Sequence, residues 1–141
     1  MYNIIVLAGH LGRDPEMRYL PDGTPVTNFS VATNRKWTGS DGVSHEETTW
    51  FRITTWRRQA EVCNEFLKKG RPVLVEGRLN PGENGGPKIW TGQDGVARAS
   101  YEVTASTVRF LGSRGDAPRD VSDDEGDMPE GNGGNASSIP F

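Results

Sequence analysis

The stretch TTWFRITTWRR, residues 48–58, decides how the rest of this sequence is interpreted. Successive side chains of a β-strand point to opposite faces of the sheet. In a strand here, one face would be mixed aromatic and basic, with Trp50, Arg52, Thr54, Trp56 and Arg58. The other face would be an ordinary core face, with Phe51, Ile53 and Thr55. The core is therefore supplied from one side, and the two tryptophans on the other side need a different partner.

Four further stretches have the β-branched or alternating composition of strands, namely residues 4–11, 24–34, 71–79 and 99–111. In the last of them, Tyr101, Val103 and Ala105 alternate in one phase, whereas Val108 continues in the other phase. The alternation slips by one residue, which predicts a bulge or bend near residues 105–107.

Residues 57–70 predict a single helix. Ala60, Cys63 and Leu67 lie on its apolar face, two lysines suit its last turn, and Gly70 can cap it. Five strands with one helix between the third and the fourth match the order of an OB-fold. We therefore predict an all-β protein built on a five-stranded OB-fold barrel.

Two long polar connections are predicted to be loops, at residues 38–46 and 80–99. Trp37 would lie at the mouth of the first loop, and Trp90 would lie inside the second. Polar, Gly-rich surroundings are unusual for core tryptophans, although the core remains an alternative for any one of the four.

Each of the four tryptophans has a Lys or Arg within two positions of it. Aromatic rings interleaved with cations are what a groove for unpaired nucleotides requires, because every base has a π-face and every linkage carries a phosphate. The predicted base-stacking residues are Trp37, Trp50, Trp56 and Trp90. The predicted phosphate contacts are Arg18, Arg35, Lys36, Arg52, Arg57, Arg58, Arg78 and Lys88.

Charge is divided unevenly along the 141 residues. Residues 1–112 hold 14 Lys and Arg against 12 Asp and Glu, whereas residues 113–141 hold two Arg against seven acids. The second part is rich in Gly and Pro and poor in large apolar residues, so it cannot bury enough surface to offset its ordering entropy. We predict a domain over residues 1–112 and a disordered acidic tail over residues 113–141.

The tail closes with Ile139, Pro140 and Phe141. An apolar pair beside a carboxylate suits a shallow pocket with a basic rim, which predicts a tip that binds partner proteins.

Catalysis finds little support in the sequence. His10 and His45 are isolated, and no nucleophile next to a base, phosphate loop or metal-ligand spacing is present. We expect no catalytic residue, no metal and no cofactor.

The surroundings of the protein are predicted from three features. The lone Cys63 cannot form an internal disulfide and is expected to be buried in a reducing compartment. The first residues form a short apolar run that reaches glycine and then charge, unlike a secretion signal, and no stretch approaches the length that spans a bilayer. We expect a soluble protein of the cytoplasm, associated with the nucleoid and not with a membrane.

The chain resembles the bacterial single-stranded DNA-binding protein family over nearly its whole length. NIIVLAGHLGRDPEMRY is similar to that family's first strand and turn, and AEVCNEFLKKGRPVLVEGRL to its helix and fourth strand. VTNFSVATNRKW and TTWFRITTW are similar to the strands that carry stacking aromatics, here Trp37, Trp50 and Trp56. KIWTGQDG resembles the segment with a further aromatic, here Trp90, and the final IPF resembles the partner-binding tip.

The resemblance implies an OB-fold that assembles as a homotetramer and wraps a long single strand without sequence preference. It also implies a tail that recruits enzymes of DNA replication, recombination and repair.

Other classes of function stay open at this level. An OB barrel used mainly to hold protein partners would depend on the IPF tip and not on Trp50 and Trp56. A carbohydrate-binding module would pair its aromatics with carboxylates and amides, whereas the neighbours here are Arg and Lys. An enzyme comes last, for want of a nucleophile, base or metal set.

Overall fold

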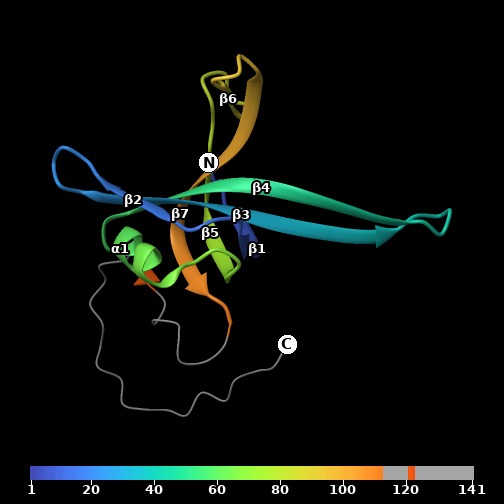
Figure 1. The fold of residues 1–141 in the computed structure, drawn as a ribbon, viewed down its shortest axis with the longest axis horizontal. Coiled ribbons are helices and arrows are strands. Elements are labelled where there is room, and N and C mark those ends of the chain that lie inside the picture. The colour runs from blue at the N-terminus through green and yellow to red at the C-terminus, as the bar shows by residue number, and fades with distance from the viewer. Residues whose placement is uncertain (113–120, 123–141) are drawn as a thin grey trace, which may run out of the picture.

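The computed structural model describes residues 1–112 and 121–122 (Figure 1). In chain order the elements are β1 (Ile5–Leu11), β2 (Glu16–Tyr19), β3 (Pro25–Thr38), β4 (Ser44–Trp56), α1 (Arg57–Phe66), β5 (Pro72–Asn80), β6 (Lys88–Thr91), β7 (Ala97–Phe110) and β8 (Val121–Ser122).

Five of these strands close into a barrel. β1 pairs with β5, β5 with β7, β7 with β4 and β4 with β3, and β3 returns to β1 through His10↔Ala32 and Leu11↔Val31. All of these pairings are antiparallel except β4–β7, which is parallel. The helix α1 lies between the third and fourth barrel strands, β4 and β5. The predicted OB-fold barrel, with its helix in that place, is confirmed.

Alternation along β4 separates core from surface as the sequence predicts. Ile53 and Thr55 are completely buried, and Phe51 packs against the core from a partly buried position. Leucine, valine and phenylalanine side chains of the other barrel strands complete the core, namely Leu7, Leu11, Phe29, Val31, Val73, Val75, Val103 and Val108. Side chains therefore fill the barrel interior, and a ligand can bind only at the outer surface of the barrel.

The predicted bulge in the last long strand is confirmed at Ser106. Glu76 pairs with Thr107 and Gly77 pairs with Ala105, so Ser106 is the extra residue on β7. Its hydroxyl donates to the Glu76 carbonyl at 3.0 Å. A Cβ on Gly77 would collide with the backbone carbonyl of Thr104, so only glycine lets the two strands approach so closely at the bulge.

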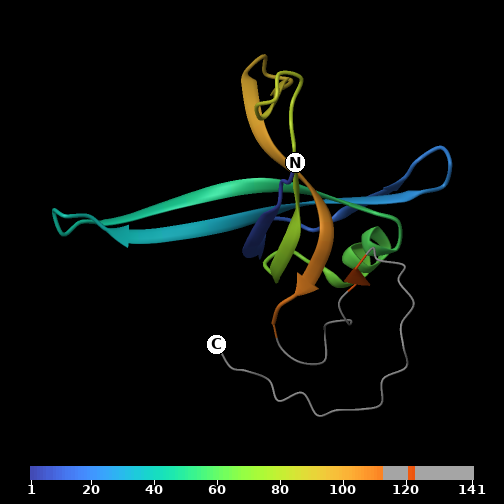
Figure 2. The same cartoon turned by 180° about the vertical axis from the view of Figure 1, so that it is seen from behind.

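The two polar connections are loops over shorter stretches than predicted, because strand continues into each of them. The first lies outside strands only over residues 39–43, and β6 with the first residues of β7 occupies part of the second. β3 and β4 extend as a two-stranded arm far beyond the barrel, and β6 with the start of β7 forms a second arm (Figures 1 and 2). Each arm ends in an Asp-Gly turn, in which Asp41 accepts from the Val43 amide and Asp94 from the Val96 amide. The glycine after each aspartate adopts a positive φ, and Asp-Gly is a strong sequence signal for a turn of this kind.

The helix is shorter than the sequence predicts. It ends at Phe66, so the lysines at 68 and 69 lie outside it and Gly70, with φ of 85°, belongs to the following turn. It also begins directly at the end of β4, because Arg57 adopts a left-handed φ of 58° and turns the chain without a loop. Arg58 is therefore on the helix, and its predicted place on the strand face beside Trp56 is wrong.

The two-residue strand β8 pairs with Thr107 and Val108 of β7. The remaining residues of the predicted disordered tail, including the predicted tip Ile139, Pro140 and Phe141, lie outside the described residues. Within the described part of the chain, no helix is long and apolar enough to cross a membrane.

Candidate nucleic-acid interface

The outward face of β4 carries two large exposed rings with a cation between them. Trp50 is 53% exposed and Trp56 is 37% exposed, and the side chain of Arg52 lies between them along the strand. Nε of Arg52 is 4.0 Å from Oε2 of Glu102 on β7. The inward face of the same strand is packed in the core, so the backbone beneath these groups is held by the barrel.

Trp50 rests on the turn that follows β1. A Cβ added to Gly12 would come 2.6 Å from Cη2 of the Trp50 indole. The absence of a side chain at residue 12 therefore leaves room for the edge of the six-membered ring of the indole. The ring remains half exposed.

Polar side chains from four strands surround the rings. Strand register places Ser30, Arg52, Glu102 and Asn80 in one row across the outer face. The next row contains Asn28, Thr54, Thr104 and Arg78. Hydrogen bonds link these side chains, from the Thr54 hydroxyl to the Asn28 amide oxygen at 2.9 Å and from the Asn80 amide to the Thr104 hydroxyl at 2.6 Å. The outer face is thus a polar platform with aromatic rings at its edges.

A groove of about 650 Å³ brings Trp50 and Trp90 together. Its lining includes Arg13, Trp50, Arg52, Trp90 and Tyr101. Trp90 belongs to β6 and Trp50 to β4, and the sequence contains no signal that would place them in one groove. Small-molecule sites commonly span about 300–1,000 Å³. A groove of this size, open and lined by indoles and guanidinium groups as well as the carboxylates of Asp14 and Glu16, suits flat aromatic groups on a charged chain.

The second arm fixes Trp90 through Arg98. The two residues are paired across β6 and β7, and the guanidinium carbon lies 5.4 Å from the indole centroid. Arg98 also binds Asp94 at 2.6 Å. Hydrogen bonds from the Val96 amide and from Arg98 hold the pKa of the Asp94 carboxyl below its ordinary value, so the carboxylate stays charged down to lower pH.

Trp37 lies on the first arm, where β3 and β4 have left the barrel. It is 38% exposed and pairs with His45 across the strands. Arg35 lies over the same indole and also pairs with Glu47. Trp37 and Val31 lie an even number of residues apart on β3, so they belong to the same face of the two-stranded ribbon. Trp50 pairs with Ala32 and therefore belongs to the opposite face. The structure brings Trp50 and Trp90 together and places Trp37 at a separate position.

The predicted phosphate contacts divide into three groups. Arg52, Arg78 and Lys88 lie on or beside the outer face described above. Arg18 is exposed on β2, where it pairs with Val26, which itself pairs with Trp56. The others lie at the arm or on the helix, namely Arg35, Lys36, Arg57 and Arg58.

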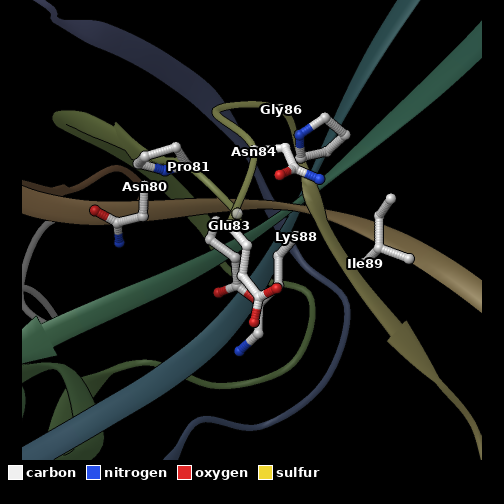
Figure 3. A pocket seen from close by; sticks show the side chains of 10 residues that line it. Asn80, Pro81, Glu83, Asn84, Gly86, Lys88 and Ile89 are labelled. Carbon is white, nitrogen blue, oxygen red and sulfur yellow. The ribbon is translucent and has the colours of Figure 1, made fainter.

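A second hollow of about 650 Å³ lies where residues 80–89 fold over Glu102. Figure 3 shows the Lys88 and Glu83 side chains extending in the same direction within it. Because Glu83 and Glu102 both line this hollow, its charge is mixed and the positive charge of Lys88 is partly offset there.

Two residues of this face are not predicted from the sequence. Arg98 supports Trp90, and Tyr101 is 51% exposed although its alternation with Val103 predicts a core position. Arg13, a basic candidate of the sequence near the first strand, lines the groove. Tyr101 is exposed because β7 leaves the barrel there, and its ring rests on Phe51 with centroids 5.7 Å apart. The sequence signal for this exposure is an aromatic residue at the first position of a series of alternating apolar residues.

Cys63 is completely buried in α1, and burial raises the pKa of its thiol to about 12. Among residues 1–112, no three His, Cys, Asp or Glu side chains gather as metal ligands would.

The fold and this face together define an OB-fold protein that carries exposed aromatic rings and cations on the outside of a filled barrel. The chain matches the model of the single-strand binding protein family over residues 2–111. Accordingly, the chain belongs to the single-strand binding protein family.

Relatives of known name agree with this assignment. A single-stranded DNA-binding protein of Neisseria meningitidis serogroup A is 42% identical over 112 residues, which are 79% of this chain and 61% of that protein. The match therefore spans about 61% of the length of the Neisseria relative. A single-stranded DNA-binding protein of Wolinella succinogenes is 39% identical over 115 residues, covering 82% of this chain and 67% of that protein.

The fold is also similar to a solved structure, a Plasmodium falciparum SSB complex with ssDNA. The TM-score is 0.66 at 27% identity, and the match covers 79% of this chain and 97% of that chain.

Proposed function

We propose that this protein binds single-stranded DNA with little sequence preference and without catalysis. Bases stack on Trp50, Trp56, Trp90 and, at the arm, Trp37, while Lys and Arg side chains neutralise phosphates. The relatives and the solved structure support the class of ligand through their own names.

The groove shared by Trp50 and Trp90 is the observation that carries the proposal. Both indoles are about half exposed and line the groove together with arginines. Trp50 lies on a barrel strand whose other face is packed in the core, and Trp90 lies on the exposed β6–β7 arm. Burying such rings against bases contributes roughly 1–3 kcal/mol per stacked base, independently of which base it is. Duplex DNA hides its base faces, so the same groove would gain much less from a double strand.

The basic side chains supply the remaining affinity. Arg52, Arg78 and Lys88 lie beside the rings, where a backbone that follows stacked bases must pass. Each phosphate contact releases a condensed counterion, so the logarithm of the association constant falls by about 0.7 per contact for each unit of log salt.

Tryptophan fluorescence, titrated with oligo-thymidine at low and high salt, tests the proposal. We expect quenching that saturates at a definite nucleotide count and an affinity that falls with salt. The control is a duplex of equal length, which should quench weakly at the same ionic strength. Unchanged fluorescence together with no retention of labelled oligo-thymidine on a filter would contradict the proposal.

The assembly and the protein partners rest on the family resemblance. We propose a homotetramer, and light scattering of the full chain should then give four times the mass of one chain. We also propose that the tip Ile139–Pro140–Phe141 recruits proteins of DNA replication, recombination and repair. Deleting these three residues should abolish partner capture and leave oligo-thymidine affinity unchanged, and loss of both would contradict this division of roles.

A further inference from the structure

The arm of β3 and β4 carries a pair of rings that core packing does not explain. Trp37 and His45 face each other across the strands, with centroids 5.3 Å apart and planes inclined by 22°. Over residues 34–48 none is buried. Two stacked rings on a solvent-exposed ribbon contribute little to stability, so their arrangement calls for a function.

A guanidinium holds the indole in place. The Arg35 guanidinium carbon lies 4.8 Å from the Trp37 ring centroid, and its Nη1 is 3.6 Å from Oε1 of Glu47. Arg35 and Trp37 lie two residues apart on one face of the arm, and their cross-strand partners are Glu47 and His45. Arg35 therefore contacts both Glu47 and the Trp37 ring, and its contact with the ring is a cation–π contact.

The rings border an open hollow of about 430 Å³. It is lined by Lys36, Trp37, Thr38, Ser44, His45 and Glu46. No ring of the barrel groove lines this hollow, so the arm offers a site of its own.

We infer that Trp37 and His45 form one two-ring platform for nucleobases, on which His45 is a further base-contacting residue. Arg35 is then a positioning residue that holds the indole, which replaces the phosphate role predicted for it from the sequence. This inference rests on the proposed function, because it names a residue of the same binding activity. Stacking needs the flat ring at position 45 and does not need its charge.

Variants of the full chain, titrated with oligo-thymidine at two salt concentrations, test the platform. We expect His45→Ala to weaken binding about 3- to 10-fold, the size of one aromatic contact, and His45→Phe to bind within about twofold of the natural chain. Arg35→Gln should weaken binding without changing the salt slope. Lys36→Gln, which removes a charge from the neighbouring position, is the matched control and should reduce the slope by about 0.7.

Several results would overturn the inference. An unchanged affinity of His45→Ala does so, and so does an equal loss in His45→Phe and His45→Ala. A slope reduced by about 0.7 in Arg35→Gln would make Arg35 a phosphate contact. If the natural chain itself did not bind, the proposed function would fail, and that outcome is separate from a failure of the variants alone.

A second measurement does not depend on variants at position 45. The indole N–H signal of Trp37, assigned with Trp37→Phe, should shift when oligo-thymidine is added to the natural chain. An indole signal that stays unchanged at saturation would overturn the platform.

Discussion

The same two strands pass through two different environments. From the Val26–Trp56 pair to the Ala32–Trp50 pair, β3 and β4 are part of the barrel, and their inward residues Phe29 and Ile53 are buried. From Asn34 and Thr48 outward to the turn, the strands keep the same antiparallel pairing, but none of their side chains is buried.

The difference shows what backbone pairing alone provides. In the barrel, alternate side chains of each strand are packed in the core. This packing fixes the backbone, so the rings on the outer face are held on a rigid base. In the arm, side chains are organised by cross-strand contacts such as Trp37 with His45, each worth about 0.2–1 kcal/mol. Trp50 is therefore positioned by the fold, whereas Trp37 is positioned by its immediate neighbours.

Ile53→Ala gives the largest expected effect. Removing this completely buried side chain should lower the free energy of unfolding by about 2–5 kcal/mol, because a cavity is left in the barrel. Urea denaturation measures the loss. The matched arm variant is Thr48→Ala, which removes an exposed hydrogen bond to Asn34 and should change stability by about 0.5 kcal/mol or less. An equal loss in both variants would contradict the difference in packing between the barrel and the arm.

Trp50→Ala should act on binding and much less on stability. We expect the affinity for oligo-thymidine to fall by about 5- to 160-fold, which corresponds to one lost stacking contact of about 1–3 kcal/mol. Trp50→Phe, which keeps a ring, is the control and should retain part of the affinity. A larger loss from Trp37→Ala than from Trp50→Ala would reverse the ranking of the two regions.

Gly42→Ala probes the arm without touching the barrel. Gly42 has φ of 77°, where a side chain costs about 1 kcal/mol or more, so the turn of the arm is expected to loosen. Amide hydrogen exchange should accelerate along residues 34–48, while the melting temperature changes little because these residues make no core contacts. Gly86→Ala is the control, since a Cβ there meets no atom within 4 Å and no positive φ is required. Faster exchange in the barrel strands as well would show that arm and barrel unfold together.

Cys63 gives the smallest expected effect, which is no reaction at all. Because burial raises the pKa of this thiol to about 12, the thiolate is scarce at pH 8 in the folded barrel. A thiol reagent should therefore label Cys63 only after unfolding, when the pKa returns to its ordinary range. Labelling of the native protein at the rate of the denatured chain would show that the barrel opens as readily as the arm.

Local patterns in the sequence predict the barrel well. Alternation in residues 48–56 predicts both faces of β4, because a strand has period two and one face must be buried. The phase slip before Val108 predicts the bulge at Ser106 for the same reason. The helix end and the arms are predicted less well. Gly70 suggests a helix that continues to residue 69, whereas α1 ends at Phe66. The polar composition of residues 38–46 and 80–99 suggests loops throughout, whereas strand pairing continues through part of each stretch.

The sequence by itself determined the class of fold and the chemistry of the outer face, because alternation and residue type are local properties. Only the tertiary structure decided which of these groups meet. Trp50 and Trp90 share a groove, Gly12 lies at the edge of the Trp50 indole, and Trp37 lies with Arg35 and His45 on an arm. These contacts depend on the register between strands distant in the chain and on where each strand leaves the barrel, and neither is written in any single stretch of residues.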